Sequence, residues 1–238
     1  MTTPIFRDRT EAGQQLAERL TAYRQRRDVL ILGLPRGGVP VAAVIAEALD
    51  APLDVCLVRK LGVPGNPELA MGAIASGDEI SHNGPVLERC QIAPEAFAEV
   101  VAQERQELQR REQRYRGDRP APVIRDRTVI LVDDGVATGA TMLAAIASIR
   151  AQAPRQLIVA VPLAAPLICE DLRRQVDEVI CGATPHPFRY LGLWYEDFSP
   201  TSDDDVCQLL SAFESCESSE SSASSESEDL AGEPKSQR

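Results

Sequence analysis

Val129-Ile130-Leu131-Val132-Asp133-Asp134-Gly135-Val136-Ala137-Thr138-Gly139-Ala140-Thr141 is the stretch that decides the fold of this chain. Its four consecutive aliphatic residues predict a strand buried on both faces, as in a parallel sheet covered by helices. Two carboxylates follow at the carboxyl end of that strand, where open α/β sheets bind their ligands. A glycine-containing loop then leads into a helix that we expect to begin near Thr138.

The loop after the acidic pair has the features of a phosphate-binding site. Its glycines permit tight turns, and the N–H groups and positive dipole end of the following helix favour a phosphate. Thr138 and Thr141 add hydroxyl donors. Because carboxylates alone would repel a phosphate, Asp133 and Asp134 must face another part of the ligand. A ribose 5-phosphate meets both demands, since its 2- and 3-hydroxyls can donate to the carboxylates.

Strands and helices alternate through the rest of the chain, which predicts an α/β fold with a doubly wound parallel sheet flanked by helices. The expected strands are Val29–Leu32, Leu53–Val58, Ala70–Ala75, Val129–Val132, Leu157–Val161, Val176–Ile180 and an edge strand at Leu191–Tyr195. The expected helices run from a capping box at Asp8 and Glu11 to about Arg24, then over Val39–Leu49, Pro94–Arg116, Thr138–Ala151 and Leu167–Arg174.

Two segments interrupt this alternation. The Gly- and Pro-rich stretch from Leu61 to about Gly84 predicts a long, flexible loop. A helical insertion over about residues 85–117 follows, and its helix Pro94–Arg116 is rich in charge with a narrow apolar stripe. We expect that helix to pack on the domain; the alternative is a subunit contact, which would make the protein a homodimer.

Charge is distributed unevenly. The formal net charge of the chain is −11, and residues 203–238 carry ten acidic residues against two basic ones. The nearly neutral body offers no electrostatic argument for binding nucleic acid. The tail is too poor in apolar residues to order itself, which predicts a domain over 1–210 and a disordered Ser/Glu-rich tail over 211–238.

The sequence also bears on compartment and on metal sites. No signal peptide is apparent, and no apolar run approaches the ~20 residues needed to span a bilayer, so we expect a soluble, cytoplasmic protein without a membrane partner. The six cysteines form no Cys-x-x-Cys pair and the chain has two histidines, so no zinc-type cluster is predicted.

From Val29 to Phe198 the chain resembles the type I phosphoribosyltransferase family. The family pattern of aliphatics, two acids and a Gly/Thr loop matches Asp133-Asp134 followed by a phosphate loop of Ala137, Thr138, Gly139, Ala140 and Thr141. Family members bind pyrophosphate in a short loop after the first core strand, where this chain has Pro35-Arg36-Gly37-Gly38. They often carry Arg-Lys after the second strand, and Arg59-Lys60 stands there.

This resemblance implies transfer of a ribosyl 5-phosphate from phosphoribosyl diphosphate to a nitrogenous base, with release of pyrophosphate. It implies that Asp133, Asp134 and Lys60 are catalytic, and it implies magnesium held through the substrate near the two aspartates. The residues that it assigns to pyrophosphate are Arg36, Gly37, Gly38, Arg59 and Lys60.

For the acceptor, relatives stack the base on an aromatic from the C-terminal part of the domain. The candidates are Trp194, Tyr195 and Phe198, although ordinary packing of an edge strand is an equal alternative. Glu68 is a weaker candidate for a general base.

Other readings of the acidic pair fit less well. Receiver domains place such a pair on their first strand, whereas half of this chain precedes it, and a triphosphatase needs Gly-x-x-x-x-Gly-Lys-Ser/Thr, which is absent. The alternative function is a non-catalytic regulator of the same fold that senses phosphoribosyl diphosphate or nucleotides. Arg59-Lys60 favours the enzyme, because a sensor could lose contacts to the leaving group.

Overall fold

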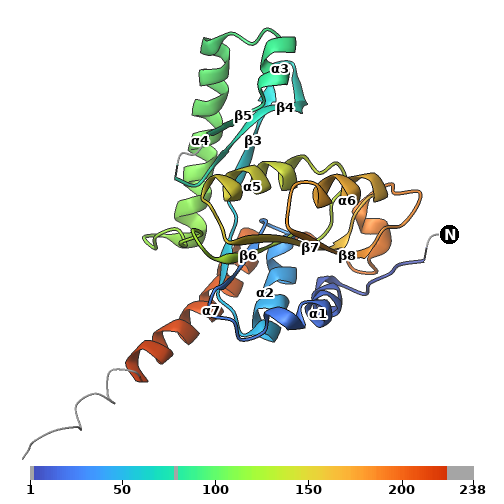
Figure 1. The fold of residues 1–238 in the computed structure, drawn as a ribbon, viewed down its shortest axis with the longest axis vertical. Coiled ribbons are helices and arrows are strands. Elements are labelled where there is room, and N and C mark those ends of the chain that lie inside the picture. The colour runs from blue at the N-terminus through green and yellow to red at the C-terminus, as the bar shows by residue number, and fades with distance from the viewer. Residues whose placement is uncertain (1–2, 78–79, 224–238) are drawn as a thin grey trace, which may run out of the picture.

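The computed structural model, which describes residues 3–77 and 80–223, is built on a five-stranded parallel sheet (Figure 1). The strand order is β2-β1-β6-β7-β8, and every neighbouring pair is parallel. The strands are β1 Val29–Gly33, β2 Leu53–Val55, β6 Thr128–Val132, β7 Gln156–Leu163 and β8 Glu178–Ala183. The predicted α/β fold is therefore confirmed, with the acidic pair at the end of its central strand.

Helices cover both faces of this sheet, as the buried aliphatic strands predict (Figure 1). The helices are α1 Arg9–Arg19 and α2 Gly38–Leu49 on one face and α5 Ala140–Ala151 and α6 Pro166–Arg173 on the other. Alternate side chains of β6 point to opposite faces of the sheet. Ile130 and Val132 pack with α1 and α2, and Val129 and Leu131 pack with α5 and α6.

Helix α1 begins at the predicted cap. The Asp8 carboxylate accepts the N–H of Glu11 at 2.8 Å, and the Glu11 carboxylate accepts the N–H of Arg7 at 2.6 Å. The helix ends at Arg19, before the predicted Arg24, and a short 3-10 turn over Thr21–Tyr23 follows.

A three-stranded antiparallel sheet replaces the flexible loop predicted over Leu61–Gly84. Its strands are β3 Val58–Val63, β4 Asn66–Ala75 and β5 Ile80–His82. Leu61 and Met71 on these strands are fully buried, and the hairpin between β3 and β4 turns at Gly65, whose φ is +81°. The loop prediction is wrong for this part of the chain, whereas the strand expected at Ala70–Ala75 is confirmed as the second half of β4. Strand β2 ends at Val55 because β3 turns away into the second sheet.

The glycines that suggested a loop have another physical cause. A Cβ on Gly62 would lie 2.8 Å from Pro67 Cα, and a Cβ on Gly72 would overlap the carbonyl oxygen of Ser81. These glycines allow paired backbones to approach closely, which is a known use of glycine within strands.

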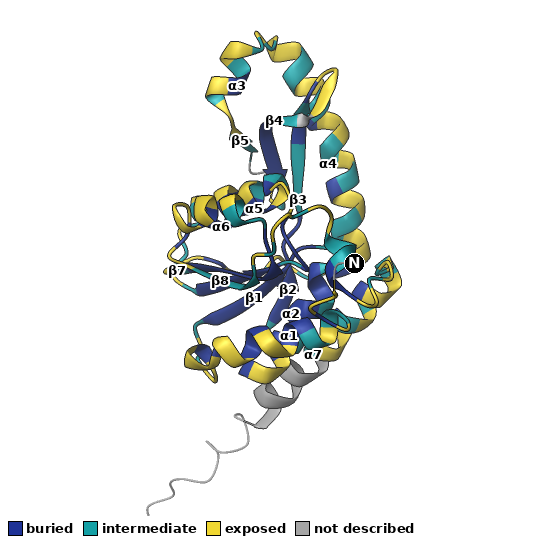
Figure 2. Cartoon of the chain, turned by 90° about the vertical axis from the view of Figure 1, so that its right-hand side faces the viewer, coloured by how far each residue is buried: buried dark blue, intermediate teal, exposed yellow. Residues whose placement is uncertain are grey.

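The second sheet combines with α3 Gly84–Arg89 and α4 Pro94–Arg116 into a projection that we call the arm, residues 58–116 (Figures 1 and 2). Val101, Leu108 and Tyr115 of α4 are buried, which confirms that this helix packs on its own chain. Over residues 3–77 and 80–223, no helix is both long and apolar enough to cross a membrane.

A buried ion pair fixes the end of α4 to the parallel sheet. The Arg116 guanidinium donates from Nε to both carboxylate oxygens of Asp54, at 3.1 and 3.2 Å. It also donates to the Val55 carbonyl at 2.7 Å and to the Ser76 hydroxyl at 3.1 Å. These bonds join α4 to β2 and to the end of β4, so the root of the arm is held rigidly.

The segment predicted as an edge strand, Leu191–Tyr195, is instead a 3-10 helix over Leu191–Trp194. The Trp194 carbonyl accepts the N–H groups of Ile5 and Phe6, at 2.9 and 3.0 Å. The strand prediction is wrong because this segment pairs with the N-terminal segment and not with the sheet edge.

A last helix, α7 Asp203–Ala223, crosses the predicted boundary at 210, and residues 224–238 of the predicted tail lie outside the described part. Its start is a capping box in which the Ser202 hydroxyl accepts the Asp205 N–H at 3.1 Å and the Asp205 carboxylate accepts the Ser202 N–H at 2.7 Å. Val206 and Leu210 are buried in the main core.

Candidate functional site

The acidic pair lies at the carboxyl end of β6, as the sequence predicts. Asp134 is buried and Asp133 is half-buried. The Asp133 carboxylate accepts the N–H of Asp134 at 2.9 Å, which orients the first acid. The pair therefore occupies the edge of the sheet at which a fold of this kind binds its ligands.

The predicted phosphate loop connects this pair to α5. Ala137 and Thr138 are exposed, and Gly139 is the N-cap of the helix with φ +78°, a left-handed conformation that glycine adopts readily. Helix α5 begins at Ala140, two residues later than predicted, so Ala140 and Thr141 lie in its first turn. The N–H groups of such a first turn lack acceptors within the helix and can bind an anion.

The loop between β1 and α2, Pro35–Gly38, packs directly against the acidic pair. A Cβ on Gly37 would overlap the Asp134 carboxylate. A Cβ on Gly38 would lie 2.8 Å from Asp133 Cα. The loop that the sequence assigns to pyrophosphate thus packs on the acidic pair, and only glycine fits where the two meet.

This contact predicts that Gly37→Ala destabilises the fold by about 1–3 kcal/mol, because the methyl group displaces Asp134 from a packed position. Gly37 has φ −65°, so the effect is steric and not a matter of backbone strain. Gly84→Ala is a matched control: a Cβ there meets nothing within 4 Å, and its effect should stay within about 0.5 kcal/mol. Urea unfolding measures both, and an unchanged midpoint for Gly37→Ala would contradict the close contact.

Arg9 holds Asp134 in place, and sequence reasoning missed it. The Arg9 guanidinium lies 2.8 Å (Nε) and 2.7 Å (Nη2) from Asp134 Oδ2. Both side chains are nearly buried, at 13% and 11% exposed. No local pattern points from Arg9 to a partner 125 residues away.

The carboxylates have perturbed pKa values for identifiable reasons. Burial, followed by the negative charge of Asp134, raises the pKa of Asp133 well above its usual range. Burial also raises the pKa of Asp134, while Arg9 opposes that rise through its charge and hydrogen bonds. A cluster of this kind favours any ligand that brings hydroxyl donors or positive charge to the acids.

The aromatic residues predicted to stack on a base have other partners. Trp194 and Tyr195 are buried in a small core with Phe6, and the Tyr195 hydroxyl donates to the Asp134 carbonyl at 2.7 Å. Phe198 stacks on Tyr195 at 4.9 Å between ring centroids, and the Arg9 guanidinium lies 4.0 Å from the Phe198 centroid. These rings buttress Arg9 and Asp134, as the packing alternative expects. Their stacking on a base stays a prediction.

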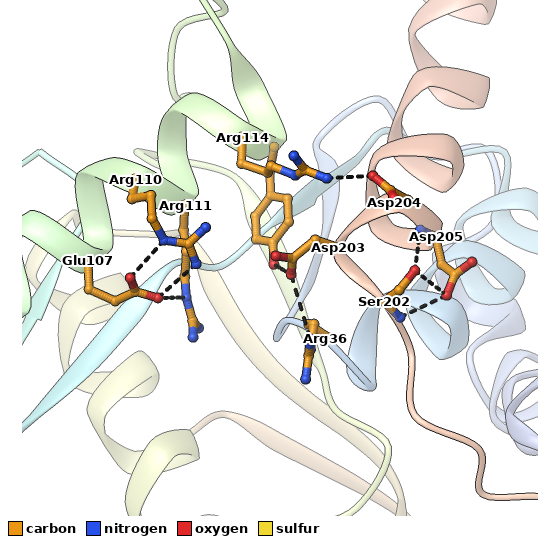
Figure 3. A network of polar contacts seen from close by, with 10 residues as sticks. Arg36, Glu107, Arg110, Arg111, Arg114, Ser202, Asp203, Asp204 and Asp205 are labelled. Atoms are coloured by element: carbon orange, nitrogen blue, oxygen red, sulfur yellow. Dashed lines mark hydrogen bonds and ion pairs between the residues drawn. The ribbon is translucent and has the colours of Figure 1, made fainter.

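Arg36, in the predicted pyrophosphate loop, contacts the start of α7. The peptide bond before it is cis. Its Nη1 lies 3.9 Å from Asp203 Oδ1, which also accepts the Tyr115 hydroxyl at 2.6 Å (Figure 3). Half of the Arg36 side chain is exposed. Asp203, which the sequence suggested only as tail charge, therefore borders the site.

Arg59 and Lys60 lie on strand β3, where they pair with β4, and not at the mouth of a loop. Arg59 Nε donates to Glu104 of α4 at 2.6 Å. Both basic residues line a cavity of about 370 Å³ that Pro35 and Thr141 border as well. This cavity joins the pyrophosphate loop, the first turn of α5 and the arm. Glu68, the candidate general base, is on β4.

Comparison with known proteins agrees with this arrangement. A family model described as the phosphoribosyl transferase domain matches residues 8–181. Two Mycobacterium tuberculosis proteins, from strains CDC 1551 / Oshkosh and H37Rv, carry names that provisionally assign them as phosphoribosyl transferases. Each is 44% identical to this chain over 206 residues, which is 87% of this chain and 46% of the relative. The chain thus spans about half the length of the curated relatives it matches.

A crystal structure of a protein from Thermus thermophilus has the same fold, with a TM-score of 0.79 and 42% identity. The match covers 87% of this chain and 98% of that one. These findings confirm the resemblance that the acidic pair and its loop suggested. With the family model spanning most of its length, the chain belongs to the phosphoribosyl transferase domain family.

Proposed function

We propose that this chain is a magnesium-dependent phosphoribosyltransferase that moves a ribosyl 5-phosphate group from phosphoribosyl diphosphate to a nitrogenous base or related small molecule. The observation that carries the proposal is the contact of Gly37 and Gly38 with Asp134 and Asp133. That contact supports the proposal because it sets the proposed diphosphate loop against the two carboxylates, and the proposed phosphate loop follows those carboxylates directly in the chain.

Each group of the substrate then has a partner. The 5-phosphate lies in Ala137–Thr141, bound by backbone N–H groups and threonine hydroxyls. The ribose 2- and 3-hydroxyls donate to Asp133 and Asp134. The pyrophosphate lies against the Pro35–Gly38 loop and toward Arg59 and Lys60, whose cavity adjoins that loop.

The chemistry is displacement of pyrophosphate from carbon 1 of the ribose by a nitrogen nucleophile. The bond from carbon 1 to the pyrophosphate oxygen breaks, and positive charge develops on the ribose ring. Asp133 and Asp134, fixed beneath that ring, stabilise the charge as a preorganised field. Arg36, Arg59 and Lys60 bind the negative charge that the leaving pyrophosphate carries away.

Magnesium fits this donor set when the substrate carries it. Within the described residues, no three acidic, histidine or cysteine side chains form a cluster that could hold a metal ion by themselves. Mg²⁺ characteristically binds through one or two carboxylates together with substrate phosphates. Asp133 and Asp134 would supply those carboxylates. When bound, the ion neutralises charge on the pyrophosphate.

A thermal-shift titration with phosphoribosyl diphosphate and Mg²⁺ is the first test. A ligand that binds only the folded state adds about 2.7 kcal/mol of stability at ~100 times its dissociation constant, so the melting temperature should rise by several degrees. Ribose 5-phosphate should give a smaller shift, since it lacks the diphosphate. An unchanged melting temperature with phosphoribosyl diphosphate argues against the proposal.

Pyrophosphate release in the presence of a panel of bases then tests catalysis. We expect release with at least one base and not with phosphoribosyl diphosphate alone. Binding without release under every condition would favour the non-catalytic regulator.

A further inference from the structure

One face of α4 carries two charged residues where the helical repeat otherwise places apolar ones. Phe97, Val101, Leu108 and Tyr115 form the inward stripe, at spacings of four and seven residues. Glu104 and Arg111 continue the same stripe, because each lies three or four residues from its neighbours on that face. Charged residues on a packed face indicate that something polar lies opposite them.

The cavity of about 370 Å³ is what lies opposite. Glu104, Leu108 and Arg111 line it from α4, and Lys60 and Thr141 line it from the proposed diphosphate and phosphate sites. Its described lining therefore contains three cationic side chains, those of Arg59, Lys60 and Arg111, against the single carboxylate of Glu104. This balance favours an anionic ligand.

Arg111 is held in a fixed position next to this cavity. Its Nε donates to Glu107 Oε1 at 2.9 Å, and its side chain is 29% exposed (Figure 3). Four residues further on, Tyr115 is buried, and the next residue, Arg116, forms the buried ion pair with Asp54. The last turns of α4 cannot move independently of the parallel sheet, so Arg111 is preorganised and not a swinging surface side chain.

Arg111 also lies near the pyrophosphate loop. Burial and the hydrogen bond to Asp203 raise the pKa of the Tyr115 hydroxyl to about 12, and the charges of Arg111 and Arg36 act on the same hydroxyl in the opposite direction. Figure 3 shows Arg36 and Arg111 in one view, and Pro35 of the pyrophosphate loop lines the same cavity as Arg111. Arg36 belongs to the Pro35–Gly38 loop, so Arg111 faces the diphosphate site from the arm.

We propose that Arg111 binds the diphosphate group of phosphoribosyl diphosphate, so that α4 of the arm forms one wall of the leaving-group site. This inference rests on the proposed function and adds a binding residue to it. Guanidinium groups bind phosphate oxygens through two parallel N–H bonds, which a lysine cannot reproduce. Glu107 holds the guanidinium in position before the ligand binds.

The chain offers a matched control for this residue. Arg110 donates to the same Glu107 carboxylate, at 2.8 and 3.0 Å, but it is 55% exposed and is absent from the cavity lining. Arg111→Gln and Arg110→Gln each remove one positive charge and the ion pair with Glu107. The two variants should therefore lower the melting temperature by similar amounts. They differ in that only the charge of Arg111 borders the cavity.

Isothermal titration calorimetry with magnesium pyrophosphate and with magnesium phosphoribosyl diphosphate tests the inference. Arg111→Gln should weaken both ligands about tenfold, as expected for one charge-assisted hydrogen-bond pair, while Arg110→Gln stays within about twofold of the wild type. Equal affinities for the two variants would overturn the role of Arg111. Wild-type protein that binds pyrophosphate through Arg111 but not phosphoribosyl diphosphate would refute the proposed function and the identity of the ligand, while Arg111 would keep its role in binding a free diphosphate. Binding of neither ligand would refute both.

Glu107→Gln gives a second test, in which the expected change in pyrophosphate affinity is an increase and Arg111 itself is kept. Its hydrogen bonds with Arg110 and Arg111 lower the pKa of Glu107 to about 2, so the wild-type carboxylate is ionised and competes with the ligand. Glutamine keeps an acceptor oxygen that can hold the Arg111 guanidinium in position but removes the negative charge. The substitution should therefore tighten pyrophosphate binding, and the gain should vanish when Arg111→Gln is present as well. An equal gain in both backgrounds would show a general charge effect and overturn the inference.

Discussion

Asp133→Asn should abolish ribose-dependent binding and yet make the folded protein more stable at neutral pH. The variant keeps the acceptor oxygen that bonds to the Asp134 N–H at 2.9 Å, so the local backbone geometry is preserved. It loses the negative charge that the ribose hydroxyls and the developing positive charge require. Removing one preorganised electrostatic group of this kind costs roughly a hundredfold or more in catalysis.

The gain in stability follows from the raised pKa of Asp133. Because burial and Asp134 raise that pKa above its unfolded value of about 3.9, the folded state binds the proton more tightly than the unfolded chain. The stability that Asp133 contributes is complete below the unfolded pKa and is lost as the pH rises through the folded pKa. Asparagine does not titrate. The stability advantage of Asp133→Asn over the wild type should therefore grow by about 1.4 kcal/mol for each pH unit between the unfolded and the folded pKa of Asp133.

Urea unfolding of wild type and Asp133→Asn between about pH 4 and pH 8 measures this effect, with the pH window set by the direction of the shift. The unfolding free energies of the two proteins should be closest at the acid end of this range and should differ increasingly toward neutral pH. Asp118→Asn, on the exposed turn after α4, should leave phosphoribosyl diphosphate binding unchanged. A variant that binds like the wild type, or that is less stable at neutral pH, would refute the role assigned to Asp133.

Arg9→Gln should destabilise the fold by about 3–5 kcal/mol, the cost of removing one partner from a buried ion pair. Arg9 lies 2.7 Å from Asp134 Oδ2, and its charge lowers the pKa of both acids against the effect of burial. Glutamine leaves the buried Asp134 carboxylate, and the half-buried Asp133 beside it, without that cation. It also removes the guanidinium from the Phe198 ring.

Two further variants separate this ion pair from a general loss of charge. Arg7→Gln removes a neighbouring arginine that is 65% exposed and paired with Asp8, and its cost should be small beside that of Arg9→Gln, because solvent screens an exposed ion pair. Asp134→Asn in the Arg9→Gln background removes the charge that the first substitution stranded, and it should recover part of the lost stability. If Arg9→Gln and Arg7→Gln had the same unfolding free energy, that result would contradict the importance of the ion pair between Arg9 and Asp134.

Arg9 contacts Asp134 and is not part of the cavity lining, so we assign it as a positioning residue. It comes from α1. From the C-terminal segment, Phe198 packs on the Arg9 guanidinium and the Tyr195 hydroxyl donates to the Asp134 carbonyl. The two ends of the domain therefore meet at the acid that the proposal assigns to the ribose. Changes in either end should alter binding without touching the central strand.

The sequence by itself determined the parallel sheet and the acidic edge of it. Four aliphatics in a row at Val129–Val132 can be satisfied only by burial on both faces, and the acids and glycines that follow occupy the ligand edge of such a sheet. Helix Pro94–Arg116 was predictable to the residue, because proline at its start and glycine after its end set local limits.

Tertiary structure alone decided what surrounds that edge. From local sequence alone, the glycines between Leu61 and Gly84 predict a loop. In the fold they lie in a sheet, where they allow paired backbones such as those of Gly72 and Ser81 to approach closely. Packing pairs Arg9 with Asp134 and sets Arg111 on the same cavity as Lys60, although these residues are remote along the chain. Backbone propensity depends on near neighbours, whereas the charge that a buried carboxylate meets depends on which distant side chain the packing brings to it.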